Sequence, residues 1–354
     1  MTTIDAPTGH PSRVPDPQRI GWALALGGGG SVGLAYISGV LSGLSDAGLD
    51  AGSAGLVVGT SAGAVAGAAI RKGTRPADLL DMADAEPDAA AAASGRAPRH
   101  FERAWTGGMD LCNRMVGSSA VVARSMLKLP LPMPPAHLDA FFPGGLFRPR
   151  GTGMHRRFGD AWPADPLWLV AVDLKTRRRV ALGRRPEDRA HPLHRAVMAS
   201  CAVPGLYEPV RLGDRRYVDG GVNSTTSIDM ALRHGSSHVL AVVPMGYQQT
   251  GRPSTAQRIL RGPAVRGVRR ELLRAGDRAR DVLVVQPHLE DLELLGTNFL
   301  RATDNGRVTE RARSRTHDLV ARPEIAEFLA GLAASRPARR GNPGSTVRPL
   351  VEPR

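Results

Sequence analysis

The sequence predicts an α/β domain built on a doubly wound, mainly parallel sheet. Two short apolar runs, at residues 21–26 and 55–59, are separated by a helical pattern, and each leads into a turn rich in small residues. A strand, a helix and a second strand within about 40 residues form a βαβ unit, whose strands lie parallel and adjacent. The 354 residues, of which 42% are apolar, are enough to bury a sizeable core.

The first predicted helix runs from Val32 to about Ala47 and ends at Gly48. Gly39 and Gly43 lower its intrinsic helix propensity, so packing must stabilise it. Its apolar side chains share one face at helical spacing: Leu34, Ile37, Leu41 and Leu44. A second helix is predicted from Ala62 to about Arg71, directly after the second strand.

The later elements are shorter and follow the same logic. A strand pair is predicted on either side of a turn at 174–178, and a short hairpin around Gly213-Asp214 leads to Asp219. The two strands of that pair are 167–172 and 179–182. The remaining predicted elements are strands at 238–243 and 282–286, and helices at 193–201 and 228–234.

We expect one structured domain over residues 21–330. Residues 1–20 are polar and rich in proline, and residues 336–354 are rich in Pro, Gly and Arg, so both ends are predicted to be disordered. Residues 86–160 combine Ala, Pro and Gly with scattered apolar patches, and we interpret them as an inserted cap of short helices and loops. There is no internal repeat.

The formal net charge is +14, carried almost entirely by arginine. Such a surplus suits nucleic acid or anionic phospholipid head groups. Because no interleaved aromatic residues or DNA-binding module accompany it, no nucleic-acid partner is expected. Peripheral contact with an anionic membrane is the better fit, and nothing in the sequence indicates an oligomeric state.

Two cysteines stand 89 residues apart, with no CxxC pair and no His/Cys cluster at metal spacing. We therefore expect no metal and no cofactor. The first 20 residues lack the apolar stretch of a signal peptide, and no run of about 18 apolar residues occurs. The expected location is the cytoplasm, with contact to a membrane surface.

The strongest local signal is Gly59-Thr60-Ser61-Ala62-Gly63, a GxSxG pattern between a predicted strand and a predicted helix. A sharp turn in this context projects a serine hydroxyl outward, and the glycines relieve crowding of the backbone. The following helix directs its amide dipoles toward the site, which favours a developing negative charge. Ser61 is the candidate nucleophile.

A second signal is the run of glycines from Gly27 to Gly30, followed by Gly33. Consecutive glycines after a strand offer bare N–H groups, as an oxyanion hole requires. Because both turns end adjacent parallel strands, this turn and Ser61 should open on one edge of the sheet. The pattern also fits a dinucleotide-binding GxGxxG, but no acidic residue ends the second strand, which leads instead into Ser61.

The third signal is Asp219-Gly220-Gly221, after a short predicted strand. A carboxylate fixed by a glycine turn can accept the Ser61 proton, directly or through water. An ordinary turn aspartate is the alternative if Asp219 is considered alone.

Together these motifs resemble the patatin-like phospholipase family, in the family's order. A fourth block, Ala199-Ser200-Cys201-Ala202-Val203-Pro204-Gly205, resembles the segment that members carry before their catalytic aspartate. The resemblance covers residues 21–310. It implies a three-layer α/β/α fold with a mainly parallel sheet, and an acyl hydrolase domain at 21–330.

The resemblance also implies a Ser–Asp dyad without a catalytic histidine. Ser61 would attack the acyl carbonyl, Asp219 would act as base, and the amides of Gly28, Gly29 and Gly30 would hold the oxyanion. The motif glycines would be Gly33, Gly59, Gly63, Gly220 and Gly221. Substrates of the family are phospholipids, lysophospholipids and neutral acyl esters, so an acyl lipid is the expected partner.

Two departures from the family pattern stand out. Val32 occupies a position where the family usually has Arg or Lys, and residues 222–227 lack the proline of the family's Asn-x-Pro element. These departures motivate an alternative, a non-catalytic lipid-binding or scaffold protein that keeps the fold. A Ser–Asp–His triad of the α/β-hydrolase type is a further alternative, since four histidines follow Asp219: His234, His238, His288 and His317.

Overall fold

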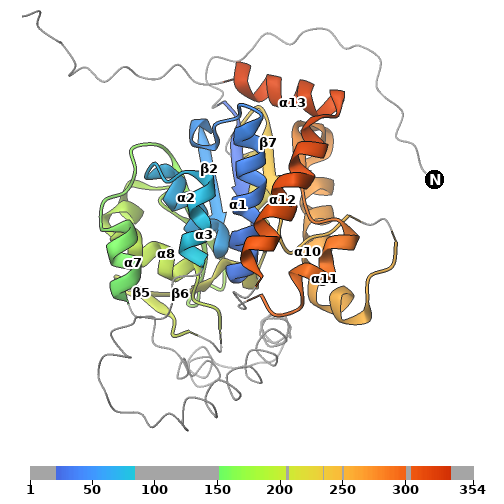
Figure 1. The fold of residues 1–354 in the computed structure, drawn as a ribbon. Coiled ribbons are helices and arrows are strands. Elements are labelled where there is room, and N and C mark those ends of the chain that lie inside the picture. The colour runs from blue at the N-terminus through green and yellow to red at the C-terminus, as the bar shows by residue number, and fades with distance from the viewer. Residues whose placement is uncertain are drawn as a thin grey trace, which may run out of the picture.

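The structure is a computed structural model that describes residues 21–83, 151–204, 207–233, 235–248, 251–299 and 304–335 (Figure 1). The predicted lead-in, the predicted tail and the first 65 residues of the predicted cap, 86–150, lie outside the described residues. The last part of the cap segment contains helix α7, Gly151–Phe158, which packs against α8, Leu193–Ser200.

One mixed sheet forms the centre of the domain, in the order β5-β6-β3-β2-β1-β7-β8, with β4 paired to β3. The strands β3, β2, β1, β7 and β8 are parallel, whereas β4, β5 and β6 add antiparallel pairs beside β3. The strand bounds are β1 Ala23–Leu26, β2 Leu56–Thr60, β3 Leu167–Asp173, β4 Arg179–Leu182, β5 Val210–Leu212, β6 Arg215–Asp219, β7 Val239–Val242 and β8 Val282–Val285.

Helices cover both faces of this sheet. Because side chains alternate along a strand, Leu24 and Leu26 of β1 contribute to one core, while Ala23 and Ala25 contribute to the other. The first core also contains residues of α1 (Gly30–Asp46), α2 (Ala62–Arg71), α8 and α12 (Asn305–Val320). The second contains residues of α9 (Ile228–Arg233) and α10 (Thr255–Ala275). The predicted three-layer α/β/α fold is confirmed.

The predicted elements up to β8 are all present, with bounds shifted by one or two residues. The first βαβ unit is parallel in register from Ala23↔Leu56 to Leu26↔Gly59, and Gly48 has the left-handed φ of 84° expected at the helix end. The strand pair around 174–178 and the hairpin at Gly213-Asp214 are antiparallel as predicted.

The two glycines in α1 are explained by a helix that the sequence did not predict. Figure 1 shows α12 alongside α1, and a Cβ on Gly39 would lie 2.2 Å from the Thr309 carbonyl oxygen. A Cβ on Gly43 would lie 2.8 Å from the Cβ of Thr316. The absence of side chains at these positions therefore allows the two helices to approach closely, which offsets the low helix propensity of glycine.

The remaining helices are α3, Leu79–Ala83, α11, Leu292–Leu295, and α13, Pro323–Ala334. No helix within the described residues has the length and hydropathy needed to cross a bilayer.

Candidate active site

The sheet register brings Ser61 and Asp219 to the same edge. Thr60 of β2 pairs with Val170 of β3, and the next residue of β3, Ala171, pairs with Asp219 of β6. Ser61 follows Thr60 directly, so Ser61 and Asp219 both stand at the level of Ala171, on either side of β3. The two residues are separated by about 160 positions in the chain but by only two strand spacings, about 10 Å between backbones.

Ser61 lies in a sharp turn between β2 and α2. Its backbone has φ 53° and ψ −118°, in the positive-φ region that residues other than glycine rarely adopt. The two glycines of the motif allow the start of α2 to pack closely against β2 and β1. A Cβ on Gly59 would lie 2.4 Å from the Gly63 carbonyl oxygen, and a Cβ on Gly63 would lie 2.0 Å from the Leu26 carbonyl oxygen.

Two residues of the fourth sequence block hold this turn, a role that the motif resemblance did not assign. The Ser61 N–H donates to the Ser200 hydroxyl at 3.0 Å, and that hydroxyl donates to the Val170 carbonyl at 2.6 Å. The Cys201 thiol donates to the Ser61 carbonyl at 3.5 Å. Burial raises the pKa of the Cys201 thiol, so it stays protonated and is not itself a nucleophile.

Asp219 ends β6 with its side chain buried, and its residue is only 4% exposed. Its carboxylate accepts a hydrogen bond from the Gly221 N–H, at 2.6 Å. Burial raises the pKa of Asp219 to about 6, against the opposing effects of the Ser61 side chain and of the Gly221 N–H, which both lower it. Gly220 packs against β3, because a Cβ there would lie 2.5 Å from the Val170 carbonyl oxygen.

The glycine turn lies beside Ser61 as predicted, but its three amides are not equivalent. A Cβ on Gly28 would lie 3.4 Å from the Ser61 Cβ. The Gly28 N–H, however, donates to the Thr225 carbonyl at 2.9 Å. Gly28 is therefore not free as the oxyanion donor that the sequence predicted. Gly29 and Gly30 form the start of α1, where amides have no partner within the helix.

Val32 is buried in α1, and its N–H donates to the Phe299 carbonyl at 3.2 Å. A cation from another element lies behind the glycine turn. Arg261 of α10 is fully buried and donates to the Pro244 carbonyl at 2.8 Å, and Pro244 packs against Gly29.

The guanidinium of Arg261 also stacks 5.0 Å from the ring centre of Phe299. Burial lowers its pKa to about 10, so it stays a cation at neutral pH. No acidic side chain within the described ranges forms an ion pair with it. A buried arginine thus lies behind the glycine turn, although the residue at position 32 is not basic.

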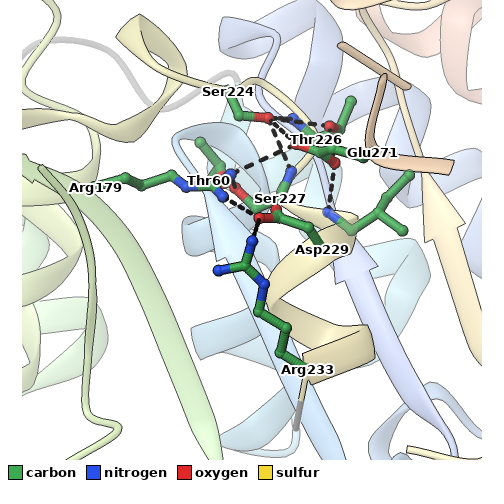
Figure 2. A network of polar contacts seen from close by, with 9 residues as sticks. Thr60, Arg179, Ser224, Thr226, Ser227, Asp229, Arg233 and Glu271 are labelled. Carbon is green, nitrogen blue, oxygen red and sulfur yellow. Dashed lines mark hydrogen bonds and ion pairs between the residues drawn. The ribbon is translucent and has the colours of Figure 1, made fainter. Parts of the chain in front are cut away.

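The segment after Gly221 is fixed by a buried polar network (Figure 2). Glu271 of α10 accepts hydrogen bonds from the Ser224 and Thr226 hydroxyls, each at 2.6 Å, and from the Ile228 N–H at 2.9 Å. Ser227, which has φ 56°, exchanges a hydrogen bond with Thr60 at 3.0 Å.

Arg179 completes this network by pairing with Asp229 and lying 3.5 Å from Glu271. The network thus fixes residues 224–228, in the segment that lacks the proline of the family's Asn-x-Pro element. It also sets the position of the Thr225 carbonyl that accepts the Gly28 N–H.

The triad alternative finds no support in the positions of three of its four histidines. His238 directly precedes β7, at the edge of the sheet opposite Ser61, and bonds to Ser237. His317 pairs with Asp46 at 2.8 Å. His288 follows β8, which lies three strand spacings, about 14 Å, from β2. His234 lies outside the described residues.

Chemically, this edge of the sheet combines a strained serine, a buried carboxylate that the serine side chain influences, and amides at the start of a helix. Those are the parts that an acyl-transfer reaction needs: a nucleophile, a base and donors for an oxyanion.

A comparison with protein-family models agrees with this assignment of the fold. A sequence model described as "Patatin-like phospholipase" matches residues 24–232, a segment that includes Ser61, Asp219 and the glycine turn. Among solved structures, the chain is similar to the crystal structure of the type III effector protein ExoU, with 15% identity and a TM-score of 0.36.

That similarity covers 88% of this chain and 54% of ExoU, so the chain spans about half the length of that protein. A search of curated proteins gives no match. The family match covers more than half of the chain and includes all three motifs of the site. The chain belongs to the patatin-like phospholipase family, a family of lipid ester hydrolases.

Proposed function

We propose that this protein hydrolyses carboxylic esters of acyl lipids through a Ser61–Asp219 dyad and an acyl-enzyme. The observation that carries the proposal is the placement of Ser61, in a strained turn before α2, at the same level of the sheet as the buried Asp219 carboxylate, whose pKa the Ser61 side chain lowers. A buried carboxylate with a pKa of about 6 is ionised at neutral pH yet is a stronger base than an exposed one.

In the first step, Ser61 Oγ attacks the ester carbonyl while its proton passes to Asp219. The tetrahedral intermediate collapses, the ester C–O bond breaks, and the leaving alcohol takes the proton from Asp219. Water then attacks the acyl-enzyme and gives a proton to Asp219. Collapse of the second intermediate releases the fatty acid and returns the proton to Ser61 Oγ.

The oxyanion is best served by the amides of Gly29 and Gly30, because the Gly28 N–H is bonded to Thr225. The positive ends of the α1 and α2 dipoles favour the same charge. Arg261 adds a buried cation behind the turn, and thereby offsets the absence of a basic side chain at Val32.

The test compares Ser61→Ala with the wild type, with Ser45→Ala, on an exposed turn of α1, as the matched control. Release of fatty acid from phospholipid and monoacyl esters should fall at least about 10³-fold in Ser61→Ala and stay unchanged in Ser45→Ala. A fluorophosphonate should add its mass to the wild type and not to Ser61→Ala. A folded wild type that neither reacts nor hydrolyses would instead favour the lipid-binding or scaffold alternative.

For the membrane, we propose that α10 provides the contact surface. Its exposed face carries five arginines together with two exposed apolar side chains, Ile259 at 61% and Leu273 at 72%. The arginines are Arg258, Arg266, Arg269, Arg270 and Arg274. Cationic side chains beside exposed apolar ones are typical of a helix that lies at the surface of an anionic bilayer.

This contact is tested by co-sedimentation with vesicles. The triple variant Arg266→Gln/Arg269→Gln/Arg270→Gln should bind anionic vesicles at least about tenfold more weakly than the wild type. A control that removes three charges elsewhere, Arg177→Gln/Arg178→Gln/Arg307→Gln, should bind nearly as well as the wild type. Equal loss in both variants would mean that net charge, and not α10, determines binding.

A further inference from the structure

A group of metal-ligating side chains gathers where α7 meets α8, apart from the motifs of the active site. It consists of His155 on α7, Asp160 in the following turn, and His194 on α8. The ligand atoms of the three side chains all lie within 4.8 Å of one another. Because 34 residues separate Asp160 from His194, their spacing in the sequence carries no metal-binding signal, and only the fold brings them together.

Both imidazole rings approach the same carboxylate oxygen. His155 Nε2 lies 3.4 Å and His194 Nδ1 lies 3.0 Å from Asp160 Oδ1. The two rings are perpendicular, with centroids 4.8 Å apart. Ligands about 2.0–2.1 Å from a tetrahedral zinc ion are separated from each other by about 3.3 Å, so both distances match those of a zinc coordination sphere.

Backbone hydrogen bonds hold the three residues in place, and the His194 Nδ1 itself lies 3.2 Å from the Gly159 carbonyl oxygen. The Leu193 N–H donates to the Asp160 carbonyl at 3.0 Å, and the His194 N–H donates to the Gly159 carbonyl at 3.1 Å. The Gly159 N–H donates to the His155 carbonyl at 2.7 Å. To accept an ion, the His194 ring has to exchange its contact with the Gly159 carbonyl for the metal, but the chain needs little ordering.

This group differs from the other histidine–aspartate contact because it brings two imidazoles to one carboxylate. His317 and Asp46 form a single pair, joined at 2.8 Å. In the group on α7 and α8, one carboxylate oxygen faces two ring nitrogens. That oxygen can accept one N–H from each ring, and a divalent cation can take the place of both protons and bind all three atoms together.

We propose that His155, Asp160 and His194 form a binding site for a divalent transition metal of the zinc class. Two imidazoles and one carboxylate are ligands that suit this class, and the remaining positions would be filled by water. The side chains of His155 and Asp160 are 56% and 66% exposed, so the ion has access from solvent, while that of His194 is only 12% exposed. The bound metal joins α7 to the first turn of α8.

This connection matters because α8 leads to the nucleophile. The last residue of α8, Ser200, accepts the Ser61 N–H, and the next residue, Cys201, donates to the Ser61 carbonyl. A metal that fixes the first turn of α8 therefore stabilises the helix that holds the Ser61 turn. The role assigned to the metal is structural, and it does not depend on the proposed hydrolase activity.

The experiment is calorimetric titration of Zn²⁺ into the full chain, free of any histidine tag and stripped with a chelator. We expect one tight site per chain. His155→Ala and Asp160→Asn change exposed side chains that the fold does not need, and each should weaken binding at least about 100-fold, since even loss of an indirect partner of a metal costs about 10–100-fold. His317→Ala is the matched control and should bind as the wild type does.

Thermal unfolding gives a second readout. Zn²⁺ at about 100 times its dissociation constant should raise the Tm of the wild type and of His317→Ala by about 4 °C, and should leave that of His155→Ala unchanged. Tight binding that persists in both His155→Ala and Asp160→Asn would overturn the proposal. So would the absence of a tight site in the wild type, or a loss of binding in His317→Ala equal to that in His155→Ala.

Discussion

Replacing Asp219 by Asn should abolish hydrolysis and at the same time make the protein more stable at neutral pH. The reason is that Asp219 is buried, and burial raises its pKa from the ordinary 3.8 to about 6. Between these two values the folded protein binds a proton that the unfolded chain has already released. The stability of the wild type therefore falls as the pH rises from about 4 to about 6, and stays at the lower level above that.

The size of this effect follows from the two pKa values. Each pH unit between 3.8 and about 6 corresponds to about 1.36 kcal/mol, which gives about 3 kcal/mol of destabilisation from the ionised carboxylate above pH 6. Asn is neutral and similar in shape, and its carbonyl can still accept the Gly221 N–H. For a chain of 354 residues, 3 kcal/mol corresponds to a rise in Tm of about 4 °C.

The assay is thermal and urea unfolding of the wild type and Asp219→Asn at pH values from 4 to 8. The difference in unfolding free energy should be close to zero at pH 4, should grow through pH 5, and should level off above pH 6. Asp214→Asn removes the same charge from an exposed position and should shift stability by less than about 0.5 kcal/mol. A destabilised Asp219→Asn, or a difference that does not vary with pH, would refute the reasoning.

Three further predictions follow from the same structure. If Asp219 is the base, kcat/KM should fall about tenfold for each pH unit below about 6, as the carboxylate becomes protonated, and a pH–rate profile with no transition near 6 would speak against it. Gly39→Ala should destabilise the protein by about 1–3 kcal/mol in urea unfolding, because its Cβ would meet the neighbouring helix at 2.2 Å. Gly267→Ala, in an open position of α10, should instead stabilise it by about 0.5–1 kcal/mol, and equal effects of the two changes would contradict the packing argument. Glu271→Ala should cost about 3 kcal/mol in the same assay and lower kcat/KM, since it leaves three buried donors without their acceptor. Glu290→Ala, whose side chain is 80% exposed, should cost less than about 1 kcal/mol, and a similar loss in both would show that the network is not special.

The first half of the fold could be predicted because its elements are apolar and punctuated by glycine. The strands at residues 23–26 and 56–60 are fully buried and contain only small or apolar residues and one threonine, and the helices between and after them end at clear stops. The motifs therefore fell on the correct turns, and parallel pairing placed them on one edge of the sheet.

The C-terminal helices could not be predicted by the same reasoning. The buried face of α10 includes Gln257, Arg261 and Glu271, so polar side chains occupy the positions where an apolar stripe would reveal a helix. A proline at position 263 further obscures the pattern. The buried face of α12 likewise includes Asn305 and Thr316. The three residues of α10 are buried because each hydrogen-bonds to a segment outside the helix, which local periodicity does not report.

Within the site, the sequence identified the residues of the motifs but not those that support them. Ser200 belongs to a recognised block, yet its bond to the Ser61 N–H depends on how α8 crosses β3. The engagement of the Gly28 N–H by Thr225 depends on the segment after Gly221, where this chain departs from the family. Both are contacts between segments more than 130 residues apart, which no spacing along the chain encodes.

The close contact of α12 with Gly39 and Gly43 also has a bearing on where the catalytic unit ends. The region shared with the family stops at residue 232. Helix α1 begins at the glycine turn, however, and it packs against α12, which starts only at Asn305. The segment after Asp219 is likewise held by a hydrogen bond to Glu271. Helices α10 and α12 thus support the candidate active site from outside the region that the family model matches. A shortened version for expression or crystallisation therefore has to keep the chain through Val320.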